Sequence, residues 1–265
     1  MRHAPPFNPE DAMKQQNLAA AQFGATAQSY LTSCVHLQGA DLQRLSRLAR
    51  ELRARDALDL GCGAGHASYA LAEGSMQVTA YDISTAMLDV VAAEARQRGL
   101  ENLRTQQGPA EHLPFADAAF DLVATRFSAH HWLDVRAALA EARRVLKADG
   151  TLVVIDVVAP ENPLFDTVLQ TVEILRDASH VRDYRVSEWS AMLQAAGFAA
   201  PASDRWTLPM EFASWTARMR TSALRADAVR DVLAQAAQEA RQHFDVQPDG
   251  SFRLDVAWLQ ARPAA

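Results

Sequence analysis

The stretch Asp59-Leu60-Gly61-Cys62-Gly63-Ala64-Gly65 decides how this chain of 265 residues is expected to fold. It ends a short apolar segment that begins at Ala57, which is typical of a buried strand, and a helical pattern follows it to about Glu73. Glycines at such a junction let the backbone turn tightly and approach a ligand, while the next helix offers N–H groups at its start. The stretch predicts a strand, a nucleotide-binding loop and a helix.

Strand and helix patterns alternate on both sides of this loop. A helical pattern over residues 37–52 precedes it, and strand patterns at 76–81, 103–106, 120–125 and 151–158 follow, separated by helical patterns that end at Gly99 and at Asp149-Gly150. Short, almost continuously apolar strands are typical of a parallel sheet covered on both faces. We therefore expect an α/β fold with a doubly wound, mostly parallel sheet.

The pattern changes after Ala159. Two further strands, at residues 200–208 and 251–260, are expected to pair at the sheet edge and to complete a seven-stranded sheet. Residues 160–198 and 209–245 are then insertions, and an insertion of this size between edge strands is typical of a cover or lid.

The composition excludes several classes of protein. Hydrophobic residues make up 49% and charged residues 22%, as in folded domains, and 26 Lys and Arg against 32 Asp and Glu give a net charge of −6. This mild acidity argues against a nucleic-acid-binding protein. Two cysteines support neither a zinc site nor a disulfide framework. We therefore expect no metal. No apolar run has the length of a membrane span or a signal peptide, so we expect a cytoplasmic protein without a membrane segment.

The glycine spacing distinguishes between nucleotide cofactors. A dinucleotide fingerprint that starts at Gly61 would need a glycine at position 66, where His66 stands. An NAD-dependent oxidoreductase is therefore the less favoured alternative.

Several motifs carry a family resemblance. The pattern Asp-x-Gly-x-Gly-x-Gly, with an acidic residue closing the second strand, resembles motif I and its sequel in class I S-adenosylmethionine-dependent methyltransferases. Residues 120–123 and 141–152 resemble the UbiE-like branch, and residues 22–31, 128–132 and 176–182 are similar to the YafE-type bacterial methyltransferases. The resemblance covers nearly the whole chain. It implies a single methyltransferase domain with a cofactor-covering segment at 1–36, a cofactor-binding core at 37–159, and the two insertions as a helical cap on the acceptor side.

The resemblance implies S-adenosyl-L-methionine as the cofactor. Asp82 is then expected to accept hydrogen bonds from both ribose hydroxyls, and Asp59 to reach the loop amides or the cofactor's amino group. Ile83 and Met87 would bracket the adenine, although Met87 also fits a purely core-packing position. The expected cofactor-binding residues are Tyr30, Asp59, Gly61, Gly63, Gly65, Asp82, Ile83, Met87, Ala110, Glu111 and Arg126.

One position departs from the family pattern, and two others are expected at the methionine end of the cofactor. Pro109 stands where UbiE-like enzymes have an aspartate that holds the adenine edge, and proline offers no N–H and no side-chain acceptor. The Ala110 backbone and Glu111 remain for that contact. Arg126 is expected to face the methionine end of the cofactor, and Tyr30 to close over it.

Methyl transfer needs an aligned acceptor, and a hydroxyl, amine or acidic carbon also needs a base. His131 or His130, which follow the fourth strand, are the expected catalytic residues; the alternative is that one of them caps the next helix or bonds the backbone.

His180, Arg182 and Tyr184 either line the acceptor pocket or form an exposed loop. We expect a small-molecule acceptor, and a non-catalytic cofactor-binding module remains the main alternative. The acceptor, the methylated atom and the oligomeric state stay open.

Overall fold

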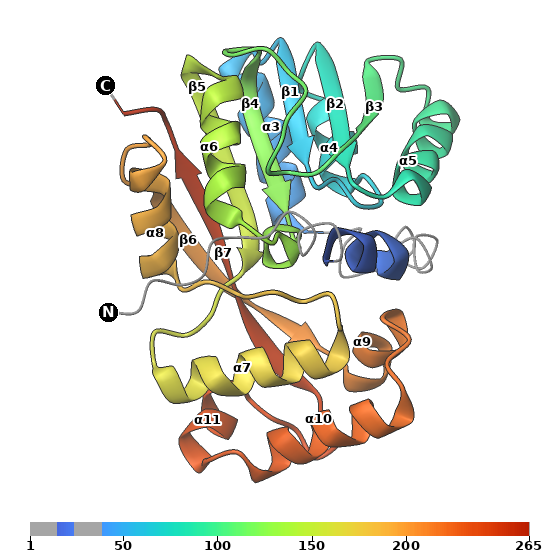
Figure 1. The fold of residues 1–265 in the computed structure, drawn as a ribbon, viewed down its shortest axis with the longest axis vertical. Helices are drawn as coiled ribbons and strands as arrows, with labels where there is room; N and C mark the ends of the chain where they lie inside the picture. The colour runs from blue at the N-terminus through green and yellow to red at the C-terminus, as the bar shows by residue number, and fades with distance from the viewer. Residues whose placement is uncertain (1–14, 24–38, 265) are drawn as a thin grey trace.

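The computed structural model describes residues 15–23 and 39–264 and confirms the predicted seven-stranded α/β sheet. The strand order is β3-β2-β1-β4-β5-β7-β6 (Figure 1). Strands β1 to β5 run parallel, whereas β7 is antiparallel to both of its neighbours, β5 and β6. The strands are β1 Asp56–Leu60, β2 Gln77–Asp82, β3 Leu103–Gln107, β4 Phe120–Arg126, β5 Leu146–Val157, β6 Ala202–Met210 and β7 Phe252–Ala261.

Helices cover both faces of the sheet because successive side chains of the central strands point to opposite sides. Leu58 and Val123 pack on one face with α6 and α8, while Ala57 and Leu122 pack on the other with α3 and α4. Helix α5 lies beside β2 and β3 (Figure 1). These helices are α3 Ala40–Leu52, α4 His66–Ala72, α5 Thr85–Arg98, α6 Val135–Val145 and α8 Val186–Ala195.

The helix before the fifth strand is shorter than the sequence pattern suggests. We expected Asp149-Gly150 to end it, but α6 ends at Val145 and β5 begins at Leu146. Leu146 already pairs with Phe120, and the register of β4 and β5 then shifts before the next pair. The expected helix end is therefore wrong, because strand pairing extends residues 146–150 against their local helical pattern.

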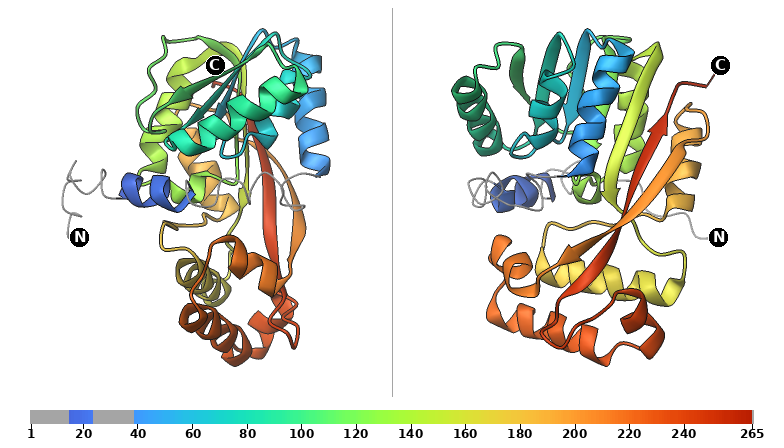
Figure 2. Two further views of the ribbon diagram at one scale, coloured as in Figure 1. Left: turned by 90° about the vertical axis from the view of Figure 1, so that its right-hand side faces the viewer. Right: turned by 180° about the vertical axis from the view of Figure 1, so that it is seen from behind.

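Four further helices form a helical lobe around the far ends of β6 and β7 (Figures 1 and 2). They are α7 Pro163–Arg176, α9 Phe212–Arg218, α10 Ala223–Gln235 and α11 Gln238–His243. Leu169, Trp215 and Leu233 belong to its own apolar core. Helix α8 instead packs on the sheet through Trp189 and Leu193. Residues 186–195 thus lie outside the helical lobe, unlike the range 160–198 expected for the first insertion.

The sheet order reverses beside β1, which has β2 on one side and β4 on the other. In doubly wound sheets, ligands bind at the carboxyl ends of the strands at such a point. A helix of residues 15–23, called here the N-terminal helix, lies between this edge of the sheet and the helical lobe (Figures 1 and 2). Within residues 15–23 and 39–264, no helix combines the length and apolar character that a bilayer crossing requires.

Candidate functional site

A pocket opens at the carboxyl ends of β1, β2 and β4, with residues of the N-terminal helix in its wall, and we call it the glycine-loop pocket. Its walls include most of the residues expected to bind a cofactor, namely Asp59, Gly61, Gly63, Asp82, Ile83, Met87, Ala110, Glu111 and Arg126. His131 also lines the pocket. Gly65 and His130 do not, and Tyr30 lies outside the described residues.

The glycine loop needs glycine at Gly61 and Gly65, because at both positions φ is positive and a Cβ would collide with a neighbouring side chain. Gly61 has a φ of +72°, and a Cβ at this position would collide with the Ser128 side chain. Gly65 has a φ of +88° and is the N-cap of α4, where a Cβ would lie 2.8 Å from the Tyr69 ring. Gly65 therefore shapes the loop without reaching the pocket itself.

Asp82 ties the glycine loop to the end of β2. Its Oδ2 accepts a 2.8 Å hydrogen bond from the Gly63 amide, and its Oδ1 accepts one of 2.8 Å from the Ser84 amide. Burial raises the pKa of Asp82, against the opposing effect of these amides. Ser84, and not Asp82, caps α5, since its Oγ accepts from the Met87 amide. The carboxylate thus stays at the pocket wall.

Asp59 is fully buried at the floor of the pocket. Its Oδ2 accepts a 2.6 Å hydrogen bond from Ser68 Oγ, whereas Oδ1 has no partner among the described residues. Burial outweighs the Ser68 bond and raises the pKa of Asp59 to about 7. A buried acceptor without a donor costs free energy, so the site favours a ligand that supplies a donor or a positive charge.

Arg126 takes part in a buried ion pair that sequence reasoning did not find. Its Nε donates a 2.6 Å hydrogen bond to Asp41 Oδ2, and both side chains are less than a tenth exposed, at 6% and 7%. Asp41 lies in the first turn of α3, where a carboxylate also interacts favourably with the helix dipole. The pair joins α3 to the end of β4.

The segment after β3 forms one side of the pocket. Tyr81 donates from its hydroxyl to the carbonyls of Pro109, at 3.2 Å, and His112, at 3.0 Å, which fixes the turn around Ala110. Glu111 is engaged through both oxygens, by Gln16 of the N-terminal helix at 3.4 Å and by the Asp134 amide at 3.3 Å.

The two adjacent histidines point to different partners. They occupy a single 3-10 turn, η1 Ala129–His131, after β4. His130 Nδ1 lies 2.6 Å from Asp156 Oδ1, and His130 does not line the pocket. Burial lowers the pKa of His130, but the Asp156 charge and hydrogen bond outweigh it and raise the value to about 9. The sequence held one sign of a buried partner for His130: Asp156 is an aspartate inside an otherwise apolar strand.

His131 borders the pocket and is held neutral. Its Nδ1 lies 3.1 Å from the Ser179 carbonyl, to which an Nδ1–H donates, and its Nε2 lies 3.9 Å from the buried Asp177 Oδ2. Burial and the neighbouring His130 charge lower the pKa of His131 to about 3. The ring of Phe23 meets the imidazole edge-on, with centroids 4.7 Å apart. His131 is thus neutral at pH 7, with Nδ1 on the Ser179 carbonyl and Nε2 beside Asp177.

The segment around His180 is not an exposed loop. His180 is buried, and its Nε2 lies 3.1 Å from Gln170 Oε1, while Tyr184 packs edge-on against Trp189. None of His180, Arg182 and Tyr184 lines the glycine-loop pocket. Across residues 15–23 and 39–264, no cluster of His, Cys, Asp and Glu has the arrangement of a metal site.

The N-terminal helix joins the two halves of the molecule over the pocket. Gln15 Nε2 donates to the Ser179 carbonyl at 2.8 Å, and Gln22 Nε2 donates to the Met219 carbonyl at 3.0 Å. Gln16 reaches the core side through Glu111. Ala19 and Phe23 add apolar surface to the pocket wall. The described part of the segment 1–36 therefore covers the site.

Comparisons with known proteins agree with this geometry. A family model described as a methyltransferase domain matches residues 58–154. The chain is 47% identical to the uncharacterized protein YafE of Escherichia coli over 205 residues, which are 77% of this chain and 99% of that protein. It is 38% identical to the uncharacterized methyltransferase YcgJ of Bacillus subtilis over 222 residues, 84% of this chain and 88% of that protein.

Two further comparisons extend the likeness. The crystal structure of YcgJ superposes with a TM-score of 0.79 at 36% identity, covering 83% of this chain and 98% of the other. The ubiquinone/menaquinone biosynthesis C-methyltransferase UbiE of Rhizobium meliloti is 31% identical over 177 residues, 57% of this chain and 67% of that protein.

Proposed function

Because this chain belongs to the class I S-adenosylmethionine-dependent methyltransferases related to YafE and UbiE, we propose that it methylates a small-molecule acceptor in the glycine-loop pocket. S-adenosylmethionine is its cofactor. The observation that carries the proposal is Asp59 Oδ1, which is buried at the pocket and has no hydrogen-bond partner among the described residues. The α-ammonium group of the cofactor supplies both the donor and the charge that this oxygen lacks.

The polar groups of the pocket fit the rest of the cofactor. A carboxylate offers about four acceptor positions, and the amides of Gly63 and Ser84 use two of those on Asp82. The remaining two are assigned to the ribose hydroxyls. Arg126, held by Asp41, is assigned to the methionine end.

The adenine end is assigned to the opposite wall. Ile83 and Met87 line that part of the pocket, and the Ala110 backbone supplies the polar contact that Pro109 lacks. Glu111 already binds Gln16 and the Asp134 amide. Its proposed role is therefore to hold the N-terminal helix over this end, and the assignment of Tyr30 and of the rest of residues 1–36 as cover remains a prediction.

When bound, S-adenosylmethionine supplies an electrophilic methyl group on a sulfonium, and its transfer is an in-line displacement. The chain has to align the acceptor and exclude water. The N-terminal helix serves the second task, because Gln15 and Gln22 bind residues beyond the pocket and Phe23 fills the space beside His131.

His131 is the residue proposed to contact the acceptor. The Nδ1–H bond to Ser179 holds the ring, Nε2 lies 3.9 Å from the buried Asp177 Oδ2, and the part of the imidazole that lines the pocket is assigned to the acceptor. A pKa near 3 makes it a weak base, so it orients the nucleophile, and the proton that the nucleophile loses on methylation passes to solvent when the products leave. His130 faces Asp156 and takes the role of a positioning residue for the turn.

The first test is a calorimetric titration of the protein with S-adenosylmethionine and S-adenosylhomocysteine, followed by transfer of a labelled methyl group to metabolite fractions. We expect micromolar binding, product formation, and about a tenfold loss of transfer in His131→Ala at unchanged cofactor affinity. His112→Ala, which removes an exposed histidine near the same pocket, is the matched control. Binding without any transfer would favour a non-catalytic module, and binding of NAD instead would overturn the proposal.

Asp59 makes cofactor affinity depend on pH. Its pKa of about 7 means that the carboxyl group is increasingly protonated below neutral pH. Binding an ammonium group requires the carboxylate, so each unit below pH 7 should weaken S-adenosylmethionine binding by up to about tenfold. Titrations between about pH 5.5 and 7.5 measure this slope. In Asp59→Asn the affinity should be low and the slope lost; an unchanged slope would contradict the assignment.

The same carboxyl group lowers the stability of the cofactor-free protein. Its folded pKa of about 7 lies above the ordinary 3.8, so the native state binds more protons than the unfolded state between these values. The free energy of unfolding therefore falls as pH rises from about 4 to 7. Asp59→Asn should remove this fall and raise the Tm at pH 7.5, by roughly 2–4 °C for each kcal/mol recovered.

A further inference from the structure

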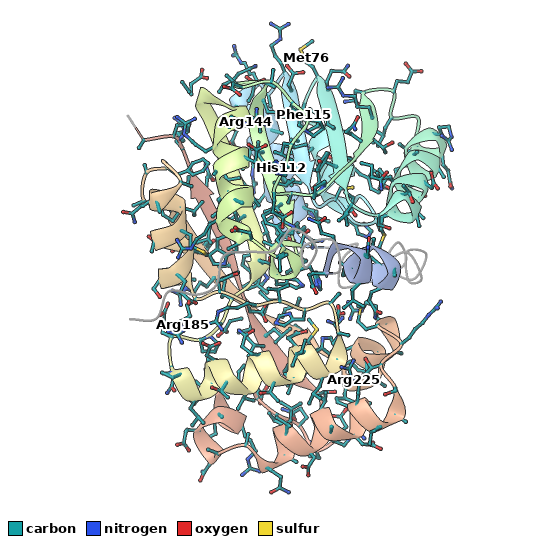
Figure 3. The ribbon with its side chains drawn as sticks, viewed as in Figure 1. Met76, His112, Phe115, Arg144, Arg185 and Arg225 are labelled. Atoms are coloured by element: carbon teal, nitrogen blue, oxygen red, sulfur yellow. The ribbon has the colours of Figure 1, made fainter. Side chains whose placement is uncertain are left out.

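A second pocket, of about 320 Å3, lies beside the glycine-loop pocket on the helical lobe, and we call it the arginine pocket. The end of α7, the loop between α9 and α10, and the N-terminal helix form it. Its charged side chains are Arg176, Arg220 and Arg225, and Gln22, Ala178, Met219, Thr221 and Ser222 complete the lining. Figure 3 labels Arg225 at the start of α10, on the side of the lobe that the end of α7 shares.

The walls of the arginine pocket are held by specific contacts. Arg176 is only 10% exposed, donates to the Trp215 carbonyl at 3.2 Å and lies over the Trp215 ring. Thr221 Oγ1 donates to the Arg176 carbonyl at 2.9 Å, and Gln22 Nε2 donates to the Met219 carbonyl at 3.0 Å. Three separate parts of the chain are thus joined around one space, which is the mark of a preorganised site.

The charge of this pocket opposes that of the whole chain. The protein carries a net charge of −6, yet three arginines meet here. Of the ion pairs within the described ranges, only Glu173 with Arg176 involves a residue of this pocket, at 3.3 Å. The resulting positive field attracts an anion.

Arg225 occupies a position that helix electrostatics disfavours. Helix α10 has Ser222 as its N-cap and no acidic residue in its first turn, where Arg225 is the third residue. The N-terminus of a helix carries partial positive charge and prefers acidic groups. An anion between Arg225, Arg220 and the helix start would remove this repulsion.

Consecutive residues of the N-terminal helix line the arginine pocket and the glycine-loop pocket. Gln22 lines the former and Phe23, beside His131, lines the latter. Ala178 lines the former, and the carbonyl of its neighbour Ser179 accepts from His131 Nδ1. Consecutive Cα atoms are about 3.8 Å apart. The linings of the two pockets therefore meet at Gln22 and Phe23, and an acceptor that uses both must extend from one pocket to the other.

We propose that the arginine pocket binds an anionic group of the methyl acceptor, a carboxylate or a phosphate, while the nucleophile of the same molecule lies beside His131. The inference rests on the proposed function, because it assigns the acceptor of that reaction to an anionic class. Arg220 and Arg225 are then specificity-determining residues. They bind the anionic end of the acceptor, which is the end remote from the atom that receives the methyl group.

The direct test measures binding of inorganic phosphate to the full chain at low ionic strength, with S-adenosylhomocysteine present. The double variant Arg220→Gln/Arg225→Gln should weaken phosphate binding about tenfold. The control, Arg230→Gln/Arg241→Gln, removes the same charge from a different pocket of the same lobe and should change it less than about twofold. No phosphate binding by the wild type, or an equal loss in the control, would overturn the inference.

A methyl-transfer assay distinguishes failure of this inference from failure of the proposed function. Metabolite extract is divided by anion exchange, and each fraction is offered with labelled S-adenosylmethionine. Label should enter the retained fraction, and the double variant should raise the acceptor KM there at unchanged cofactor affinity. Phosphatase treatment that removes the acceptor identifies a phosphate monoester; if the acceptor survives, esterification of carboxylates in the same fraction removes it only if its anionic group is a carboxylate. Transfer only to the unretained fraction would refute the anionic acceptor, whereas failure to bind S-adenosylmethionine would refute the proposed function.

Discussion

Asp82→Ala should weaken S-adenosylmethionine binding by at least about 100-fold, because each of the two charge-assisted hydrogen bonds that we propose from the ribose hydroxyls to Asp82 should contribute about 1.5–3 kcal/mol. The variant also removes the acceptor of the Gly63 amide, which holds the glycine loop in its turn. The loss therefore combines missing ribose contacts with a less ordered loop. Calorimetric titration measures the dissociation constant of each protein directly.

The control for this variant is Asp89→Ala, which removes an exposed carboxylate from α5, close to Asp82 in the chain. It changes the net charge equally and should leave the affinity within about twofold. Asp82→Asn preserves the side-chain volume and one carbonyl acceptor. Its affinity for S-adenosylmethionine should lie between those of Asp82→Ala and Asp89→Ala. The ribose assignment is wrong if Asp82→Ala folds with a normal Tm and binds S-adenosylmethionine with an affinity within about threefold of the wild type.

Asp156→Ala should lower the free energy of unfolding by about 3–5 kcal/mol, the loss typical of breaking a buried charge pair. The Asp156 carboxylate accepts from the Ala129 amide at 3.0 Å, from His130 Nδ1 at 2.6 Å and from the Val157 amide at 2.9 Å. Its removal leaves these buried donors without an acceptor. Urea denaturation of the cofactor-free protein measures the difference.

The loss should also depend on pH in a defined direction. The folded pKa of His130, about 9, lies above the ordinary 6.5, so the stabilisation is complete below 6.5 and is lost as pH rises through 9. Asp255→Ala is the matched control, since Asp255 lies 3.2 Å from His243 Nε2 and both side chains are about 30% exposed. It should cost no more than about 1 kcal/mol. Equal losses in both variants would contradict the role of the buried pair.

Much of the site followed from local sequence. The glycine spacing and Asp82 predicted the loop and the strand end correctly, because a positive φ and a strand terminus are properties of a few neighbouring residues. The cofactor roles of these residues stay predictions. Asp41 was not predicted, because its ion pair with Arg126 joins residues 85 positions apart.

The sequence by itself determined the doubly wound sheet and the position of its ligand loop, because the spacing of apolar residues and glycines sets strand, helix and turn locally. Only the tertiary structure decided which histidine lines the pocket: His130 turns toward Asp156, 26 residues away, and leaves His131 at the pocket wall. It also brought Arg176 to Arg220 and Arg225. Such meetings depend on which distant surfaces pack together, and the packing of α7 against the start of α10 has no signal in either segment alone.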